Sequence, residues 1–141
     1  MMLSLSILLL SPGSVYPNPG PNSINFSIAH LNVRSLNDND KLSEIYVLAC
    51  LYEFDVSTFS QTWLNSSVSN DSILIPGYSL PLRKDRVEKR GGGVAIYAKD
   101  HIAVKRLVEF GYSTGLEPLW VQCSVNDFVF LCGVCYRPSN Q

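Results

Sequence analysis

Two of the four cysteines have a spacing that could support metal or redox chemistry. Cys132 and Cys135 are three residues apart, a spacing found in zinc sites and redox-active pairs. They lie within the apolar run from Phe128 to Tyr136, and residues three apart on a regular strand point to opposite faces. No second closely spaced pair completes a set of four ligands. The pattern therefore favours a core strand over a metal or redox site.

The two histidines, His30 and His101, are further candidates for acid or base chemistry. His30 has the same strand parity as Asn32, so the two side chains are expected on one face of a strand. A packed or solvated histidine at a strand end is the preferred interpretation. Asp100 and His101 follow Lys99, and this polar run predicts a turn between strands.

One basic stretch could bind nucleic acid. Arg83–Arg90 holds five basic and two acidic residues beside a glycine-rich segment. A solvated hairpin tip explains the same stretch equally well. Trp63 and Trp120 could stack on bases, but buried packing is preferred for both.

Composition places these residues in one globular unit. The chain has 141 residues, of which 46% are hydrophobic and 16% charged, and this balance excludes disorder as the main state. With 11 basic and 12 acidic residues the formal net charge is -1, so nucleic-acid binding would have to rest on a local patch.

Hydrophobic periodicity predicts a strand-rich α/β fold around the candidate residues. A strand from residue 24 to Asn32 precedes an amphipathic helix that begins among Asn37–Asp40 and ends near Asp55. Val56–Phe59 is the next strand, and the spacing suits a crossover connection. Further strands are expected at residues 78–82, 93–98, 102–107, 119–125 and 128–136, the last two joined by a turn at Asn126–Asp127.

Residues 1–23 differ from the rest. No charged residue precedes Arg34, Met1–Leu10 is apolar but too short to span a bilayer, and Ser11–Pro21 has the proline and glycine content of a linker. Asn18–Pro21 resembles the end of ribosome-skipping peptides. We therefore expect a leader and linker over residues 1–23 and a folded domain over residues 24–141.

A series of short motifs resembles a known family. In order they are Asn32-Val-Arg-Ser-Leu36, Lys41-Leu42, Ser60-Gln-Thr-Trp-Leu64, Ile75-Pro-Gly-Tyr78, Asp85-Arg86, Gly91-Gly-Gly-Val-Ala-Ile-Tyr97 and Tyr136-Arg-Pro138. Together they resemble the first half of the endonuclease/exonuclease/phosphatase domain of LINE-type (non-LTR) retrotransposons. The resemblance implies a partial two-sheet α/β sandwich over residues 24–141.

It also implies a chemistry, namely Mg²⁺-dependent hydrolysis of a phosphodiester that nicks DNA. By this resemblance, Asn32 would help to order the metal and the phosphate, and Tyr136 would contact the phosphate. Gln61 stands where the family has its metal-binding Glu. Arg86 and Arg137 would lie near the nucleic acid. The implied partners are DNA and, if the reading frame continues, a downstream reverse transcriptase, with no membrane and no small-molecule cofactor.

Two departures from the family pattern predict that these 141 residues are catalytically incomplete. Gln61 can offer a carbonyl oxygen but no negative charge to hold Mg²⁺, so metal binding should be weakened or lost. The Asp-x-Asn motif that positions the attacking water in the family does not occur in the sequence, and His30 does not replace the general base. We therefore expect an amino-terminal fragment of the domain that is inactive alone.

Two other functions remain open. A degenerate domain kept as a binding module or scaffold would also explain Gln61. A small secreted glycoprotein would explain the apolar start and the acceptor sequences at Asn25, Asn65 and Asn70. An intracellular location is favoured over secretion, because the start lacks a basic region.

Overall fold

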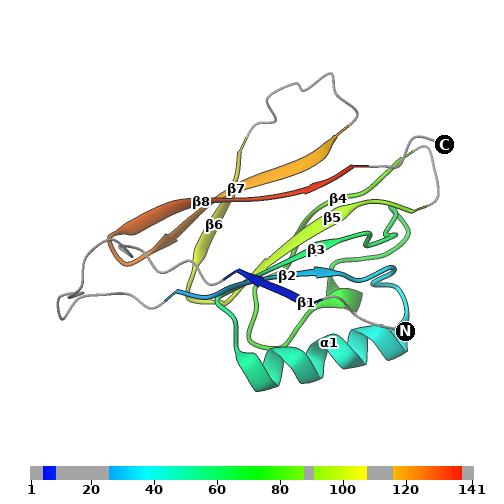
Figure 1. Cartoon of the computed structure of the whole chain (residues 1–141), viewed down its shortest axis with the longest axis horizontal. Coiled ribbons are helices and arrows are strands. Elements are labelled where there is room, and N and C mark those ends of the chain that lie inside the picture. Colours follow the sequence, from blue (N-terminus) through cyan, green and yellow to red (C-terminus); the bar gives the residue numbers. More distant parts are fainter. Residues whose placement is uncertain (1–4, 9–25, 88–90, 108–115, 138–141) are drawn as a thin grey trace.

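The computed structural model describes residues 5–8, 26–87, 91–107 and 116–137. In these ranges the chain forms strands, one α-helix and one short 3₁₀-helix in two layers of sheet (Figure 1). The strands are β1 (Leu5–Leu8), β2 (Ile28–Asn32), β3 (Val56–Ser60), β4 (Leu82–Lys84), β5 (Val94–Ala98), β6 (Ala103–Arg106), β7 (Glu117–Val125) and β8 (Phe128–Tyr136). The helices are α1 (Asn39–Tyr52) and η1 (Asp71–Ile73). The described helices include none with the length and apolar character that a bilayer crossing requires.

The first sheet has the strand order β1-β2-β3-β5-β4. β2 and β3 are parallel and are joined through α1, which confirms the predicted crossover. Of the expected leader, Leu5–Leu8 pairs antiparallel with β2, and the rest of residues 1–23 lies outside the described residues.

Helix α1 begins and ends where its sequence indicates. Asp38 is the N-cap residue, and its carboxylate accepts hydrogen bonds from the backbone N–H groups of Asp40 (3.0 Å) and Lys41 (3.5 Å). Glu53 ends the helix in a left-handed conformation (φ 47°), and its N–H donates to the carbonyl of Ala49. Leu42 and Ile45 are its buried residues, so the amphipathic pattern correctly predicted which face packs on the sheet.

The core lies on both faces of the first sheet. One cluster fills the space between this sheet, α1 and the segment after β3, and includes Leu31, Phe59 and Tyr97. The other lies between the two sheets and includes Val94, Ile96 and Leu119. All five residues of β5 are buried because the strand is covered on both faces, which explains why its sequence is continuously apolar.

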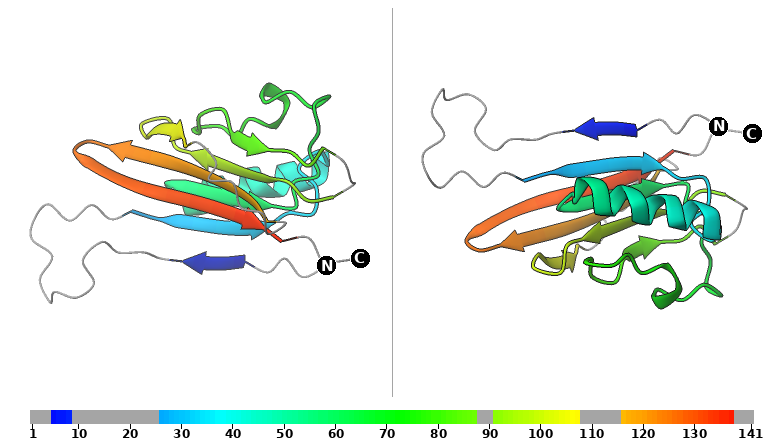
Figure 2. Two further views of the ribbon diagram at one scale, coloured as in Figure 1. Left: turned by 90° about the horizontal axis from the view of Figure 1, so that it is seen from above. Right: turned by 90° about the horizontal axis from the view of Figure 1, so that it is seen from below.

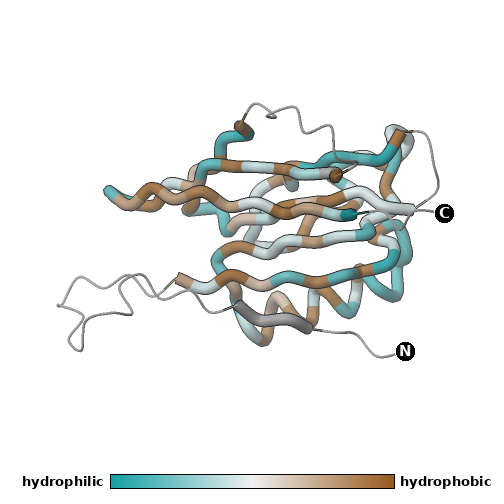
Figure 3. Tube along the Cα trace, turned by 45° about the horizontal axis from the view of Figure 1, so that its top comes forward, coloured by the Kyte–Doolittle hydropathy of each residue, from teal (hydrophilic) through white to brown (hydrophobic). Residues whose placement is uncertain are grey.

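The second sheet has the order β6-β7-β8, and β7 and β8 form the predicted hairpin. Its turn uses Asn126 at φ 51°, a conformation that asparagine tolerates without glycine. Figure 3 shows a hydrophilic hairpin tip followed by mainly hydrophobic residues. Cys132 is buried and Cys135 is exposed, which confirms the core-strand interpretation.

The strand predicted at residues 78–82 is wrong in its extent. Only Tyr78 forms an isolated bridge, to Lys99, and β4 begins at Leu82. Pro81 has no N–H to donate to a ladder, so the pairing is interrupted before it. The fold is thus a mixed α/β arrangement of two packed sheets and one helix, as expected at this coarser level.

Candidate functional site

The candidate site lies where the two parallel strands end. Asn32, the last residue of β2, is paired in register with Ser60, the last residue of β3. Ser60 also pairs with Val94 at the start of β5, and Val94 pairs with Lys84 at the end of β4. Sites commonly form in α/β sheets at the carboxyl ends of parallel strands.

The end of β8 lies at the same side of the molecule. Figure 2 shows β2 and β8 running in the same direction in both views, so the carboxyl end of β8, which Tyr136 forms and Arg137 follows, lies towards the same side of the molecule as the carboxyl end of β2. We call this region the carboxyl edge, and it comprises residues 32–36, 60–64, 85–86, 91–93 and 136–137. All five residues implied by the resemblance (Asn32, Gln61, Arg86, Tyr136 and Arg137) fall within it.

Backbone hydrogen bonds hold the loops of the carboxyl edge together. The N–H groups of Ser35 and Leu36 donate to the carbonyls of Gln61 (2.9 Å) and Thr62 (2.8 Å). The N–H group of Trp63 donates to the carbonyl of Gly92 at 3.0 Å. The strand order therefore continues into the loops, which fixes their backbones relative to one another.

The same loops concentrate left-handed backbone conformations. Arg34 (φ 47°) and Ser35 (φ 104°) follow β2, while Gln61 and Trp63 (both φ 55°) follow β3. Each such non-glycine residue costs roughly 1–2 kcal/mol, and strained residues of this kind cluster at functional sites. Four of them on two adjacent loops indicate that the carboxyl edge is built for something other than stability.

Three polar atoms buried in this region have no hydrogen-bond partner among the described residues. They are Oδ1 of Asn32, Oδ1 of Asp85 and Oγ1 of Thr62, a residue with no exposed surface. A buried polar atom left unsatisfied costs about 1–3 kcal/mol. Asn32 therefore presents an amide oxygen that a cation or a hydrogen-bond donor from a ligand would satisfy.

Tyr136 differs from three other tyrosines in the bonding of its hydroxyl. The hydroxyls of Tyr46, Tyr78 and Tyr97 donate to the backbone carbonyls of other segments at 2.6 to 2.8 Å. Tyr136 is half-buried with its ring against the inter-sheet core, and its hydroxyl has no partner in the described part of the chain. This hydroxyl is therefore available to a bound group.

Gln61 is half-buried, and it and Asn32 are the two expected metal ligands. Both contribute neutral amide oxygens, which are hard donors but carry no charge. Within the described ranges no three His, Cys, Asp or Glu side chains are grouped as a metal site. The expected ligand pair by itself does not fit resident Mg²⁺, which usually takes one or two carboxylates.

Several cations surround the carboxyl edge. Arg86 is half-buried after β4, Arg137 is exposed after Tyr136, and Arg34 is exposed after β2. Lys84 ends β4 and is half-buried. These side chains give the edge a local positive charge that the net charge of the chain conceals.

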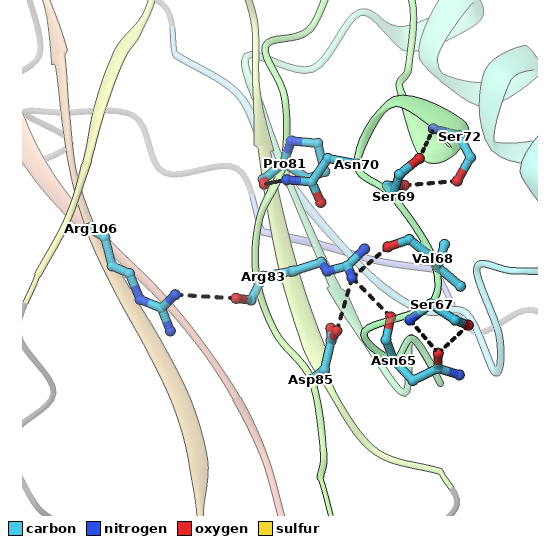
Figure 4. A network of polar contacts seen from close by, with 10 residues as sticks. All are labelled: Asn65, Ser67, Val68, Ser69, Asn70, Ser72, Pro81, Arg83, Asp85 and Arg106. Carbon is cyan, nitrogen blue, oxygen red and sulfur yellow. Dashed lines mark hydrogen bonds and ion pairs between the residues drawn. The ribbon is translucent and has the colours of Figure 1, made fainter.

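Arg83, the first cation of the basic stretch, is held by contacts within the chain. Arg83 forms an ion pair with Asp85 (3.0 Å) and donates to the carbonyls of Asn65 (3.0 Å) and Val68 (2.7 Å), as Figure 4 shows. Its own carbonyl accepts from Arg106 at 3.3 Å. Arg83 thus ties the segment after β3 to β4, and the interpretation of the whole stretch as a solvated tip is wrong at this residue.

His30 lies on the inter-sheet face, as its parity with Asn32 suggested. Its Nδ1 is 2.9 Å from Thr58 Oγ1 and its Nε2 is 3.4 Å from Ser60 Oγ, beside a cavity of about 270 Å³ that β8 also lines. Burial lowers the pKa of His30 below its usual 6.5, so the ring is neutral near neutral pH. These contacts support a packed strand histidine.

Asp100 and His101 form the predicted turn at the opposite end of β5, away from the carboxyl edge. The expectation that both tryptophans pack in the interior is wrong. Trp63 is 39% exposed and Trp120 is 38% exposed. No glycine or proline near Trp63 signals its left-handed backbone, so the sequence offered no local indication of its position.

Comparison with models of protein families gives no match to this chain, and comparison with curated proteins gives none either.

Proposed function

We propose that this chain is the amino-terminal part of an endonuclease/exonuclease/phosphatase-type domain whose carboxyl edge binds a phosphodiester of DNA, and that these 141 residues do not hydrolyse it. The observation that supports this most is the gathering of Asn32, Gln61 and Tyr136 at one strained edge. Three motifs far apart in the sequence thereby reach one place, and the family pattern requires this of them.

In this proposal the chain's own groups bind and orient the phosphodiester. The hydroxyl of Tyr136 donates to a non-bridging phosphate oxygen, and the guanidinium groups of Arg86 and Arg137 supply charge. The side-chain amide N–H group of Asn32 donates to the same phosphate, and its unsatisfied amide oxygen remains for a cation or a hydrogen-bond donor of the ligand. Binding of this kind positions a backbone without reading its sequence.

Hydrolysis needs further groups. Gln61 supplies no charge for Mg²⁺, and the sequence contains no Asp-x-Asn motif to position water. In the complete domain of the proposed family these functions come from a carboxylate at this position and from later segments, with a reverse transcriptase downstream. The present chain therefore retains recognition and lacks the chemistry.

A second candidate is a degenerate domain that functions only as a binding module or scaffold. The ligand pair Asn32 and Gln61 favours it, because neither residue carries a charge. The two candidates predict different responses when the carboxylate is restored. In an incomplete nuclease, the other groups around position 61 still suit Mg²⁺, so a restored carboxylate strengthens metal binding. In a scaffold, those groups have been lost, and the carboxylate has no such effect.

The test combines plasmid nicking with calorimetry. The purified chain should not nick supercoiled DNA in Mg²⁺, and Gln61→Glu should bind Mg²⁺ more tightly without restoring nicking. Gln122→Glu introduces the same charge in the middle of β7 and is the matched control, which should leave Mg²⁺ binding unchanged. Metal-dependent nicking by the purified chain would refute the proposed incompleteness. Equal Mg²⁺ affinity in the Gln61→Glu and Gln122→Glu variants would refute the metal-ligand assignment and favour the scaffold.

A further inference from the structure

Trp63 combines a fixed backbone with an exposed side chain. Its neighbours Thr62 and Leu64 are 0% and 3% exposed, and its own N–H group is bonded to Gly92, yet its indole is 39% exposed. The backbone there has φ 55°, which is strained for a bulky residue. The backbone is therefore strained at a position where a large aromatic ring lies outside the core.

Packing does not explain where the indole lies. Trp63 belongs to neither core cluster and forms no ring pair in the described part of the chain. Gly91 lies beside the ring, and a Cβ added to this glycine would lie 3.5 Å from the indole Nε1. Because Gly91 has no side chain, the ring is not covered from that side. Within the described residues the indole N–H has no hydrogen-bond acceptor.

Trp120 provides an instructive contrast because it is 38% exposed, almost as much as Trp63. It pairs in register with Gly133 on β8, and a Cβ on Gly133 would lie 2.4 Å from its ring. The ring of Trp120 therefore lies over a glycine of the neighbouring strand, an arrangement that stabilises sheets. Its exposure has a structural explanation that Trp63 lacks.

Charge on the carboxyl edge indicates what the Trp63 ring contacts. Arg34, Arg86 and Arg137 belong to the same edge, and the phosphodiester proposed above lies among them. A ligand that is anionic along its backbone and flat and apolar at its side groups is complementary to cations beside an aromatic ring. Single-stranded DNA has this character, and so does a DNA strand whose bases are unpaired.

We propose that the indole of Trp63 stacks on an unpaired nucleobase adjacent to the phosphodiester held at the carboxyl edge. This inference rests on the proposed function and extends it, because it names single-stranded or locally opened DNA as the preferred ligand. Base stacking on an aromatic side chain tolerates any base, so the contact contributes affinity and not sequence preference.

The experiment uses the two tryptophans as separate fluorescent reporters. Trp120→Phe leaves Trp63 as the reporter, and Trp63→Phe leaves Trp120. Each protein is titrated with a single-stranded oligodeoxynucleotide of about 12 nucleotides and with an abasic oligomer of equal length. The base-bearing strand should quench Trp63 emission and leave Trp120 emission unchanged, while the abasic strand should quench neither.

Affinity gives the second measurement. Trp63→Ala should weaken binding of the base-bearing strand by about 5- to 150-fold, the range measured for loss of one stacked base, and should leave binding of the abasic strand unchanged. Should Trp63→Ala fail to fold, the quenching of Trp63 in Trp120→Phe still decides the matter, since that protein keeps Trp63.

The outcomes separate this inference from the proposed function. If both oligomers bind the unmodified chain but Trp63 emission does not change, or the abasic strand quenches it equally, stacking is refuted and phosphodiester binding stands. If neither oligomer binds the unmodified chain, the proposed function and the stacking inference both fail.

Discussion

Gly93 is the point at which the loops of the carboxyl edge are most tightly packed, and replacing it tests how this edge is built. Gly93 has φ +83°, and a Cβ added there would lie 2.6 Å from Oγ1 of the fully buried Thr62. The left-handed conformation costs a residue with a Cβ roughly 1–2 kcal/mol, and overpacking costs about 1–3 kcal/mol more. We expect Gly93→Ala to lower the free energy of unfolding by about 2–5 kcal/mol.

Gly77 provides the matched control. It has the same φ of +83°, but a Cβ there would have no atom within 4 Å. Gly77→Ala should therefore cost only the conformational part, roughly 1–2 kcal/mol. Urea denaturation followed by circular dichroism measures both variants, provided that their m-values agree. Equal losses in the two variants would refute the argument that Thr62 crowds this position.

Two further predictions follow from burial. Because burial raises the pKa of Cys123 to about 12 and that of Cys132 to about 11, iodoacetamide near pH 8 should label the exposed Cys50 and Cys135 but not this pair, as mass spectrometry would show. Labelling of all four in the folded chain would contradict the described core. Burial lowers the pKa of His30 below 6.5, so below that pH the unfolded chain binds more protons at this residue than the folded chain does. The free energy of unfolding should therefore be highest above about pH 6.5 and should fall as the pH drops below it. Urea midpoints across this range that fall as steeply in His30→Asn would contradict the assignment.

The helix and most of the strands were predictable because they have local signals, whereas β1 lies in the segment expected as a leader and β4 begins only at Leu82. Asp38 follows the rule for helix N-caps, and the apolar runs of β5 and β8 mark strands covered by other layers. The parallel pairing of β2 and β3 followed from the length of the connection between them. These features depend on residues that are close together in the sequence, so the sequence alone is enough to predict them.

The misjudged features depend on contacts between distant segments. Arg83 was counted among the cations available to nucleic acid, but the carbonyls of Asn65 and Val68 and the carboxylate of Asp85 occupy it. The exposure of Trp63 depends on a bond to Gly92 that no sequence period reveals. In both cases, the surroundings of the side chain come from segments that are distant in the sequence.

The resemblance proposes which residues belong to the site but says nothing of how they are arranged. Asn32, Gln61 and Tyr136 are the ends, or follow the ends, of three strands, and the topology places those ends on one side of the molecule. The unsatisfied oxygen of Asn32 and the left-handed backbone of Gln61 were visible only in the structure.

The salt dependence of DNA binding, measured by fluorescence anisotropy with a labelled single-stranded oligodeoxynucleotide, tests the proposed phosphodiester site most directly. Each phosphate contact adds about 0.7 to the slope of log affinity against log salt for a single strand. We expect the unmodified chain to bind and Arg86→Ala to lower this slope by about 0.7. Lys99→Ala, which removes a half-buried cation at the opposite end of β5, should leave the slope unchanged. Absence of binding, or equal slopes in the Arg86→Ala and Lys99→Ala variants, would contradict a phosphodiester site at the carboxyl edge.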